Sequence, residues 1–577
     1  VSVIEDTAVA PERLPAYMKD FGEMLERLGL KCVYHAHIST GELHLRPVLN
    51  LKEENDRVLF RRVAEETAKL VKKHRGSLSG EHGDGRLRGE FIPLLFGEKV
   101  YGLMQETKAC WDPEGIFNAR KIVNTPPMDT SLRYEAGDSN VMCRTYFDFS
   151  KEKGWLCAIE QCNGSGDCRK SYAFGGTMCP SFRATREESH TTRARANTLR
   201  ELMTRPKTKK IYDQREILEV LDTCVSCKAC KSECPSNVDI ARFKAEFLQQ
   251  HYDVCGVPMK AFLIARLTEI QRLGTILPWF YNTIVRNRMT GNMLKRVLHF
   301  APKRTIPTLY KTTLKHWLGR YRRKNRGEIV GRVFLFADEF TNYMDVEIGI
   351  KMIELLDRLG YEVIIPKHVE SGRTAISKGM LKVAKGVARK NVLLLKSLVT
   401  ENIPLVGIEP SCILSFRDEY PDLVGDDLKE EAVRLGKNCL LYDEFFTREI
   451  RAGRIRAEQF TDQPLKIMLH GHCHQKSLAS VEPSREMLSL PVNYSVEVIP
   501  SGCCGMAGAF GYEKKHYELS MKIGEQVLFP AVRGAGENVC ISAPGTSCRQ
   551  QIKDGTGKQA LHPIEVLYEA LKCTKEK

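Results

Sequence analysis

One run of cysteines constrains this chain more than any other feature of its sequence. Cys224, Cys227, Cys230 and Cys234 follow the spacing C-x2-C-x2-C-x3-C, and Pro235 comes directly after them. This spacing is typical of chains that hold cubane 4Fe-4S clusters, and the cysteine before the proline points to a neighbouring cluster. Structural zinc fits less well, because zinc sites use two C-x2-C pairs. The run therefore predicts two clusters and a chain that carries electrons.

An upstream segment offers ligands for the second cluster. It contains Cys162-Asn-Gly-Ser165-Gly-Asp-Cys168 and, after an insertion, Cys179-Pro180. The crossed ligation rule predicts one cluster on Cys179, Cys224, Cys227 and Cys230, and another on Cys162, Cys168 and Cys234. The second set lacks a ligand because Ser165 stands where a cysteine is expected. Three alternatives stay open: a three-iron cluster, serine or water on the fourth iron at Ser165, or ligation by Cys157.

The totals limit the class of protein. With 577 residues, the chain has room for three or four domains. Its 20 cysteines, without a secretory context, indicate metal ligation in a reducing compartment, so we expect a cytoplasmic location. Apolar runs such as Val392 to Leu395 are strand-sized, far below the roughly 18 residues of a membrane helix. The chain begins at Val1 in sequence typical of a domain interior, so we expect a portion that precedes it.

Positive charge is concentrated in one segment. The net charge is +15, and residues 270–327 contain 14 Lys and Arg but no Asp or Glu. Aromatic residues are interleaved, among them Trp279, Phe280 and Trp317. Such a segment suits peripheral contact with an anionic membrane surface or an acidic partner protein. A solvated helical linker is the alternative, and we do not expect nucleic acid as a partner.

Pattern and composition divide the chain into six parts. The predicted fold class is multidomain α+β and α/β. Residues 1–127 alternate helical and strand patterns, and from Val333 short apolar strands alternate with helices as in parallel α/β units. We expect an α+β domain at 1–127, a linker at 128–149, a helical two-cluster ferredoxin-like domain at 150–255, a basic helical linker at 256–330, cysteine-rich repeat 1 at 331–460 and cysteine-rich repeat 2 at 461–577.

The last two parts form an internal repeat. The run Val333-Phe-Leu-Phe leads to Glu339 as the run Ile467-Met-Leu-His leads to Cys473. In the same way, Glu370-Ser371-Gly372 matches Cys503-Cys504-Gly505. Pro410-Ser411-Cys412 matches Thr546-Ser547-Cys548 at a similar interval. Repeat 1 is degenerate, whereas repeat 2 kept four thiols. They predict a third centre, either a further cluster or zinc, on Cys473, Cys503, Cys504 and Cys548.

Histidines in the first part form another candidate site. His37 and His44 flank Gly41, which permits a turn that returns both rings to one point. Glu81 and His82 follow on a glycine-rich loop. Two imidazoles and a carboxylate can ligate a divalent ion, and His82 would then be free for proton transfer. A plain surface loop is the alternative interpretation.

These motifs resemble a known family. Residues 1 to about 125 resemble the C-terminal half of the FAD-linked oxidases, which include D-2-hydroxyglutarate dehydrogenase, D-lactate dehydrogenase and the flavin subunit of glycolate oxidase. The resemblance rests on His37 to His44, on Glu81-His82-Gly83 and on the segment from Asp112 to Ile122. Residues 150–577 resemble the iron–sulfur subunit of glycolate oxidase, with paired cysteine-rich (CCG) domains as in heterodisulfide reductase.

The resemblance implies roles for individual residues. His37, His44 and Glu81 would hold a divalent ion, zinc or manganese, and His82 would be the general base. Arg46 stands where the family has asparagine and offers a cation for a substrate carboxylate. Asn118 would lie near the flavin, whereas the FAD-binding half itself is not in this sequence.

Together the motifs predict part of a flavin- and iron–sulfur-dependent dehydrogenase. We expect it to oxidise a D-2-hydroxy acid of the 2-hydroxyglutarate, lactate or glycolate class. Hydride would pass to FAD, because a flavin accepts two electrons and releases them singly to clusters. A quinone or a redox protein would be the acceptor. Two alternatives remain: an electron-transferring subunit that docks on a separate flavoprotein, and a heterodisulfide reductase-like thiol oxidoreductase.

Overall fold

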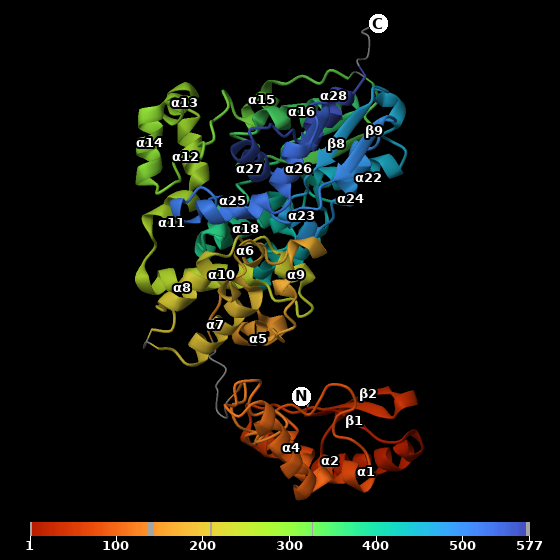
Figure 1. Cartoon of the computed structure of the whole chain (residues 1–577). Helices are drawn as coiled ribbons and strands as arrows, with labels where there is room; N and C mark the ends of the chain where they lie inside the picture. The colour runs from red at the N-terminus through yellow and green to blue at the C-terminus, as the bar shows by residue number, and fades with distance from the viewer. Residues whose placement is uncertain (1–2, 135–142, 208–209, 326, 573–577) are drawn as a thin grey trace. The chain divides into compact units, whose positions relative to one another are not determined.

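The computed structural model divides into two compact units, residues 1–140 and 141–577, and each is described by itself (Figure 1). It describes residues 3–134, 143–207, 210–325 and 327–572. Part of the predicted linker, residues 135–142, and Arg326 of the basic segment therefore lie outside the described residues.

Unit 1 is an antiparallel sheet covered by helices, which confirms the predicted α+β class. Its strand order is β1-β3-β2, and β3 pairs with both neighbours. The first helix is amphipathic and buries Tyr17, Phe21 and Leu25 against the sheet and the second helix. The elements are β1 (Ile4–Ala8), α1 (Leu14–Leu28), β2 (Cys32–His37), β3 (Glu42–Pro47), α2 (Glu54–Lys73), α3 (Ile92–Phe96) and α4 (Glu98–Trp111).

The cysteine motifs of unit 2 lie in loops between short helices. Helices α8 and α10 flank the Cys224 motif, as the apolar runs from Ile217 and Ile240 predict. Buried cysteines and aromatic residues share one core here. The helices are α5 (Trp155–Glu160), α6 (Pro180–Thr185), α7 (Thr192–Thr204), α8 (Arg215–Asp222), α9 (Ala229–Glu233) and α10 (Ile240–Cys255).

The basic segment is helical. Helices α12, α13 and α14 stand together at one side of unit 2, apart from the strands (Figure 1). Many large apolar side chains of this layer face solvent, including those of Trp279, Met289 and Met293. The helices are α11 (Met259–Ala265), α12 (Leu267–Gly274), α13 (Pro278–Arg286), α14 (Arg288–Val297) and α15 (Leu314–Arg320).

Two parallel sheets make up the rest of unit 2. The first has the order β5-β4-β6-β7 and the second has the order β10-β8-β9. In each sheet the first strand of the repeat lies between the next two along the chain. This shared order agrees with the predicted repeat. Apolar residues of both copies, such as Leu335 and Ile467, belong to one core, so the copies pack against each other.

The elements of repeat 1 are β4 (Gly331–Phe336), α16 (Val346–Arg358), β5 (Tyr361–Ile364), α17 (Arg373–Ser377), α18 (Leu381–Leu395), β6 (Leu405–Gly407), α19 (Pro410–Ile413), α20 (Tyr420–Leu423), α21 (Lys429–Lys437), β7 (Cys439–Leu441) and α22 (Tyr442–Arg451). Those of repeat 2 are β8 (Leu465–Leu469), α23 (Cys473–Leu478), α24 (Glu482–Leu488), β9 (Tyr494–Val498), α25 (Tyr517–Glu525), α26 (Leu528–Gly534), β10 (Val539–Ser542), α27 (Thr546–Thr556) and α28 (Pro563–Ala570). The apolar run from Val392, although strand-sized, ends helix α18. Within the described ranges, no helix combines the length and apolar character needed to cross a bilayer.

Candidate metal centres

The histidines of unit 1 converge on one carboxylate. His37 ends β2 and His44 lies on β3, and Gly41 makes the turn between the strands with a φ of 76°. His37 Nε2 lies 3.8 Å and His44 Nε2 3.6 Å from Glu81 Oε1. His82 Nε2 lies 3.1 Å from the same oxygen. Four predicted site residues are thus brought together from a hairpin and a loop.

This donor set fits a divalent cation. One ligand atom from each of His37, His44 and Glu81 lies within 4.8 Å of the other two. Imidazole nitrogen and carboxylate oxygen are ligands that zinc accepts. His37 and Glu81 are exposed, whereas His44 is largely buried, so the site has one protected side and one open side. A site of this kind leaves room for a substrate ligand.

The loop that carries Glu81 and His82 is held by Asp6. The Asp6 carboxylate is buried and accepts hydrogen bonds from the backbone N–H groups of Glu81, at 2.8 Å, and His82, at 3.0 Å. Ser79 Oγ and Arg88 also donate to it. Burial raises the pKa of Asp6, but these hydrogen bonds outweigh it and lower the pKa to about 2. Asp6 is therefore an ionised anchor behind the histidines.

Two further predicted site residues of unit 1 are Arg46, on the same strand as His44, and Asn118, in the loop after α4. Arg46 follows His44 by two positions on β3 and so projects from the same face of the strand. Its guanidinium donates to Glu5. Asn118 lies in the loop after α4, where it is exposed and has a φ of 48°. The apolar neighbours Ile116 and Phe117 are also exposed.

In unit 2, four cysteines from two segments line one pocket. Cys179 lies before α6, Cys224 and Cys227 lie in the loop between α8 and α9, and Cys230 lies on α9. All four are buried, and the pocket lining contains Cys179, Cys224, Cys227 and Cys230 together. This is the grouping expected for the first cluster. Four thiols around one buried pocket supply the donors that a cubane cluster requires.

The second predicted set is brought together in part. Cys162 and Cys168 are buried, and burial is the main cause that raises the pKa of Cys168, with the charge of Cys162 adding to it. Cys179 contributes to the same shift. Ser165, which lies between Cys162 and Cys168 in the sequence, is exposed. Cys234 ends α9 and packs against the same core, and its place in this centre stays a prediction.

The thiols of repeat 2 form the third predicted group. The four thiols lie close enough to shift one another's pKa values. The hydrogen bond with Cys503 lowers the pKa of Cys473 to about 7. All four thiols are buried. The chemistry of this donor set fits a thiophilic metal such as zinc or an iron–sulfur cluster.

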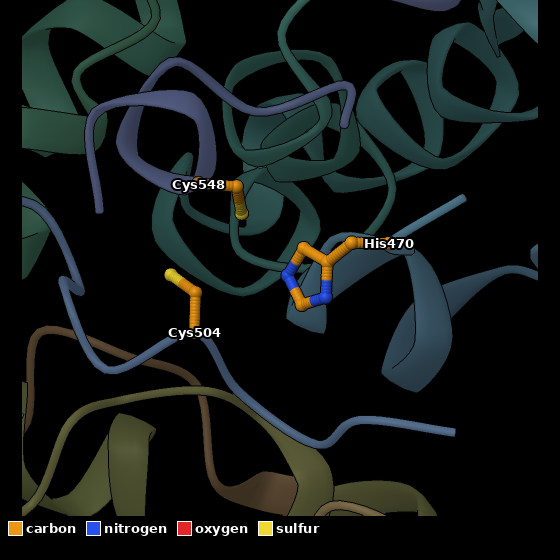
Figure 2. A group of neighbouring side chains, drawn as sticks. All are labelled: His470, Cys504 and Cys548. Atoms are coloured by element: carbon orange, nitrogen blue, oxygen red, sulfur yellow. The ribbon is translucent and has the colours of Figure 1, made fainter. Parts of the chain in front are cut away.

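A histidine joins this third group. His470 follows β8, and one ligand atom of its ring lies within 4.8 Å of those of Cys504 and Cys548. Figure 2 shows the three side chains directed toward one another from three different segments. The other side of the ring is fixed, because Nδ1 lies 2.7 Å from Ser501 Oγ. Burial lowers the pKa of His470 to about 4, so the imidazole is neutral and able to ligate a metal at neutral pH.

The first and third groups lie side by side. His474 on α23 contacts the carbonyl of Ser226 at 3.0 Å, and Ser477 Oγ donates to the carbonyl of Cys227 at 3.1 Å. The charge of Cys473 also raises the pKa of Cys227, after burial as the main cause. The helix that begins with Cys473 is thus docked directly on the loop of the first group.

Repeat 1 has its own buried cluster at the matching positions. Glu339 accepts hydrogen bonds from the backbone N–H of Ser371, at 2.9 Å, and from its hydroxyl, at 2.7 Å. Cys412 lies beside them, and burial followed by the charge of Glu339 raises its pKa well above the usual value. Asp338 has its pKa raised to about 8, mainly by burial. Carboxyl and hydroxyl groups stand here at the positions that match thiols of repeat 2, and they are joined by hydrogen bonds.

Comparisons with known proteins match two separate parts of the chain. Residues 1–122 match the family described as FAD linked oxidases, C-terminal domain, and residues 161–239 match the 4Fe-4S dicluster domain. Both predicted resemblances are confirmed. These two matches support FAD and iron–sulfur clusters as cofactors.

Individual relatives extend the similarity over the whole chain. D-2-hydroxyglutarate dehydrogenase of Escherichia coli (strain K12) is 26% identical over 610 residues, which cover 98% of this chain and 58% of the relative. The enzyme of that name from Pseudomonas putida is 27% identical, with 98% and 58% covered. A subunit of the anaerobic glycerol-3-phosphate dehydrogenase of Escherichia coli (strain K12) is 26% identical over 58% of this chain and 83% of its own length. The chain thus spans less than two thirds of the length of the 2-hydroxyglutarate dehydrogenases.

Sequence reasoning missed several residues of these centres. Asp6 lies far along the chain from the loop that it anchors, so no local motif marks it. His470 lies three residues before Cys473, and the short segment His470-Gly-His472-Cys473 could have suggested a nitrogen ligand. Arg195, which donates to Cys179 Sγ at 3.3 Å, lies in an arginine-rich helix that has no recognisable spacing.

Proposed function

We propose that this chain is the electron-transferring portion, with part of the substrate site, of an FAD-linked D-2-hydroxy acid dehydrogenase. The observation that carries the proposal is the pocket lined by four cysteines from two distant segments. Such a convergence of buried thiols is what crossed ligation of an iron–sulfur cluster requires. The names of the longer relatives support a 2-hydroxy acid as the substrate class.

The substrate end of the pathway would lie at the histidines of unit 1. His37, His44 and Glu81 would hold a divalent ion, zinc or manganese, which would supply positive charge for a substrate hydroxyl and carboxylate. His82 would act as the general base. Its two ring nitrogens lie 3.1 Å from Glu81 Oε1 and 3.9 Å from Asp6 Oδ1. Both carboxylates thus lie beside the imidazole that would take the hydroxyl proton.

Arg46 would bind a carboxylate of the substrate. Its guanidinium is half-exposed and paired with Glu5, so a substrate carboxylate would exchange with that partner. A guanidinium suits this task because its planar donors match both oxygens of a carboxylate. A bound flavin would supply the hydride acceptor, and Asn118 would lie close to it.

An FAD-binding domain, in cis or in trans, would complete the site. The surface of unit 1 after α4 exposes apolar side chains that a monomeric domain would ordinarily cover. Trp111, Ile116 and Phe117 are 83%, 72% and 69% exposed. A partner domain of this chemistry would bury them beside Asn118. The missing part of the relatives' length is consistent with such a domain.

Electrons would leave through unit 2 toward a quinone or a redox protein. The docking of α23 on the Cys227 loop supports transfer between the first group and the third. The exposed face of α13 and α14 supports peripheral contact with an anionic membrane. Its apolar side chains, such as Trp279 and Met289, lie among basic residues without acidic neighbours in the sequence. Retention on anionic but not neutral liposomes, lost at high salt, is the expected result.

Anaerobic purification of the full chain tests the central proposal. We expect iron and acid-labile sulfide, and a low-temperature EPR signal after reduction. Cys224→Ser should lose the signal of the first cluster, whereas Cys439→Ser, at an equally buried thiol on β7, should keep it. Reconstituted protein without iron or sulfide would refute the proposal. Substrate-dependent reduction after addition of a separate FAD-binding domain would establish the dehydrogenase activity.

A second candidate function is an electron-transferring subunit without a substrate site of its own. The similarity of more than half of the chain to a subunit of glycerol-3-phosphate dehydrogenase favours it. His82→Gln separates the two. Loss of turnover with an added flavin domain supports the dehydrogenase, and unchanged turnover supports the electron-transferring subunit.

A further inference from the structure

Arg195 is a buried cation with no carboxylate beside it. It lies on α7, and its side chain is 1% exposed. Its Nε donates to the carbonyl of Val220 at 3.1 Å and its Nη2 to Thr223 Oγ1 at 2.8 Å. Its Nη1 donates to Cys179 Sγ at 3.3 Å. Among the residues that the structure describes, no Asp or Glu oxygen lies within 4.0 Å of this guanidinium.

Three other cations of unit 2 are paired with acids. Arg304 is fully buried and lies 3.1 Å from Asp554. Lys228 is buried among three carboxylates. On α7 itself, Arg193 pairs with Glu188 at 2.6 Å. Arg195 therefore differs from these three cations in the kind of partner beside it.

Sulfur supplies the missing negative charge. Arg195 lines the same pocket as Cys179, Cys224 and Cys230, and its Nη1 donates to Cys179 Sγ. An isolated charge buried without compensation costs several kcal/mol. The protein tolerates Arg195 because sulfur ligands from both cluster segments surround it. The same sulfurs line the pocket of the first group.

Other positive groups near this pocket are oriented away from the sulfurs. Lys244 donates to the carbonyl of Cys224 at 2.7 Å. Arg183 donates to the carbonyls of Gly175 and Gly176. Only the Arg195 guanidinium, among the described arginines and lysines, donates a hydrogen bond to a cysteine sulfur.

We propose that Arg195 is a positioning residue that holds the Cys179 ligand and raises the reduction potential of the cluster on Cys179, Cys224, Cys227 and Cys230. This inference rests on the proposed electron-transfer function. Reduction adds one electron to the cluster and thus one negative charge. A fixed cation in a region of low dielectric constant stabilises that extra charge more than it stabilises the oxidised state. The hydrogen bond to Cys179 Sγ acts in the same direction, because hydrogen bonds to sulfur ligands are among the factors that set cluster potentials.

The test is an EPR-monitored redox titration of the holoprotein with iron quantified for each variant. Arg195→Gln should shift the midpoint of one cluster to more negative potential and leave the other centres unmoved. Arg195→Lys, which keeps the charge, should stay near the wild-type midpoint. The matched control is Arg242→Gln, because Arg242 lies in the same helical module and is paired with Asp422 at 3.1 Å. It should titrate like the wild type.

The outcomes separate this inference from the proposed function. A wild-type midpoint in fully loaded Arg195→Gln would overturn the inference while leaving the clusters established. If Arg195→Gln assembles no first cluster, Arg195→Lys decides: a wild-type midpoint supports the role of the charge, and a strongly negative one overturns it. Absence of any cluster signal in the wild type would instead overturn the proposed function.

Discussion

Replacement of Lys228 by methionine is the sharpest test of how the cluster loop is held. Lys228 lies between Cys227 and Cys230, and its side chain is 3% exposed. Its Nζ forms ion pairs with Asp418 Oδ2, at 2.5 Å, and with Glu419 Oε1, at 3.2 Å. The contact with Asp418 Oδ2 does not have the geometry of a hydrogen bond. Asp239 lies 3.3 Å away. One lysine thus links the cluster loop to repeat 1.

The magnitude follows from the charges that the substitution leaves behind. Burial lowers the pKa of Lys228, but the three carboxylates outweigh it and raise the pKa, so the ammonium is charged. Lys228→Met leaves three buried acids whose remaining ion-pair partners, among the residues that the structure describes, are Lys231 and Arg373. Removal of one partner from a buried ionic network typically costs about 3–5 kcal/mol. With a urea m-value of about 3 kcal/mol/M, the unfolding midpoint of this region should fall by about 1 M or more.

Bleaching of the cluster absorbance in urea measures this midpoint, because the first group unfolds with its loop. Lys231→Met is the control, since Lys231 pairs with the same Asp418 but is 38% exposed. A partly solvated ion pair contributes at most about 1 kcal/mol. Equal midpoints for Lys228→Met and Lys231→Met would refute the idea that burial, rather than the mere presence of an ion pair, sets the contribution.

Three further predictions concern the other centres. Asp6→Asn should destabilise unit 1 by about 1–3 kcal/mol at pH 7. The carboxylate has a pKa of about 2 in the fold, so its contribution to stability is lost as the pH falls from about 4. Thermal unfolding of the variant and the wild type should therefore converge below that pH. Ser165→Ala should leave the iron content and EPR signals unchanged, because Ser165 is exposed, and any loss of iron would assign it as a ligand. His470→Gln should reduce the metal bound at the third centre, as counted by elemental analysis. The control is His562→Gln, at another buried histidine that caps α28, and it should retain the metal. Equal metal contents in the two variants would exclude His470 as a ligand.

Much of the candidate chemistry could be predicted from local spacing. The candidate ligands Cys224, Cys227 and Cys230 belong to one short segment, and their separation alone limits what they can bind. His37 and His44 are joined by a hairpin whose turn needs Gly41, so their convergence also has a local cause. The parallel sheets could be predicted because strand and helix periods alternate in both repeats.

Amino-acid order alone determined the type of metal chemistry, the repeat and the charge of the basic helices, because each depends on residues close together in the chain. Only the tertiary structure decided which charges face the centres. Asp6 behind His82, Arg195 against Cys179, Lys228 against Asp418 and His470 beside Cys548 all arise from long-range packing. Burial excludes water at these contacts, so partners distant in sequence supply the opposite charges and hydrogen bonds there, and the fold selects those partners.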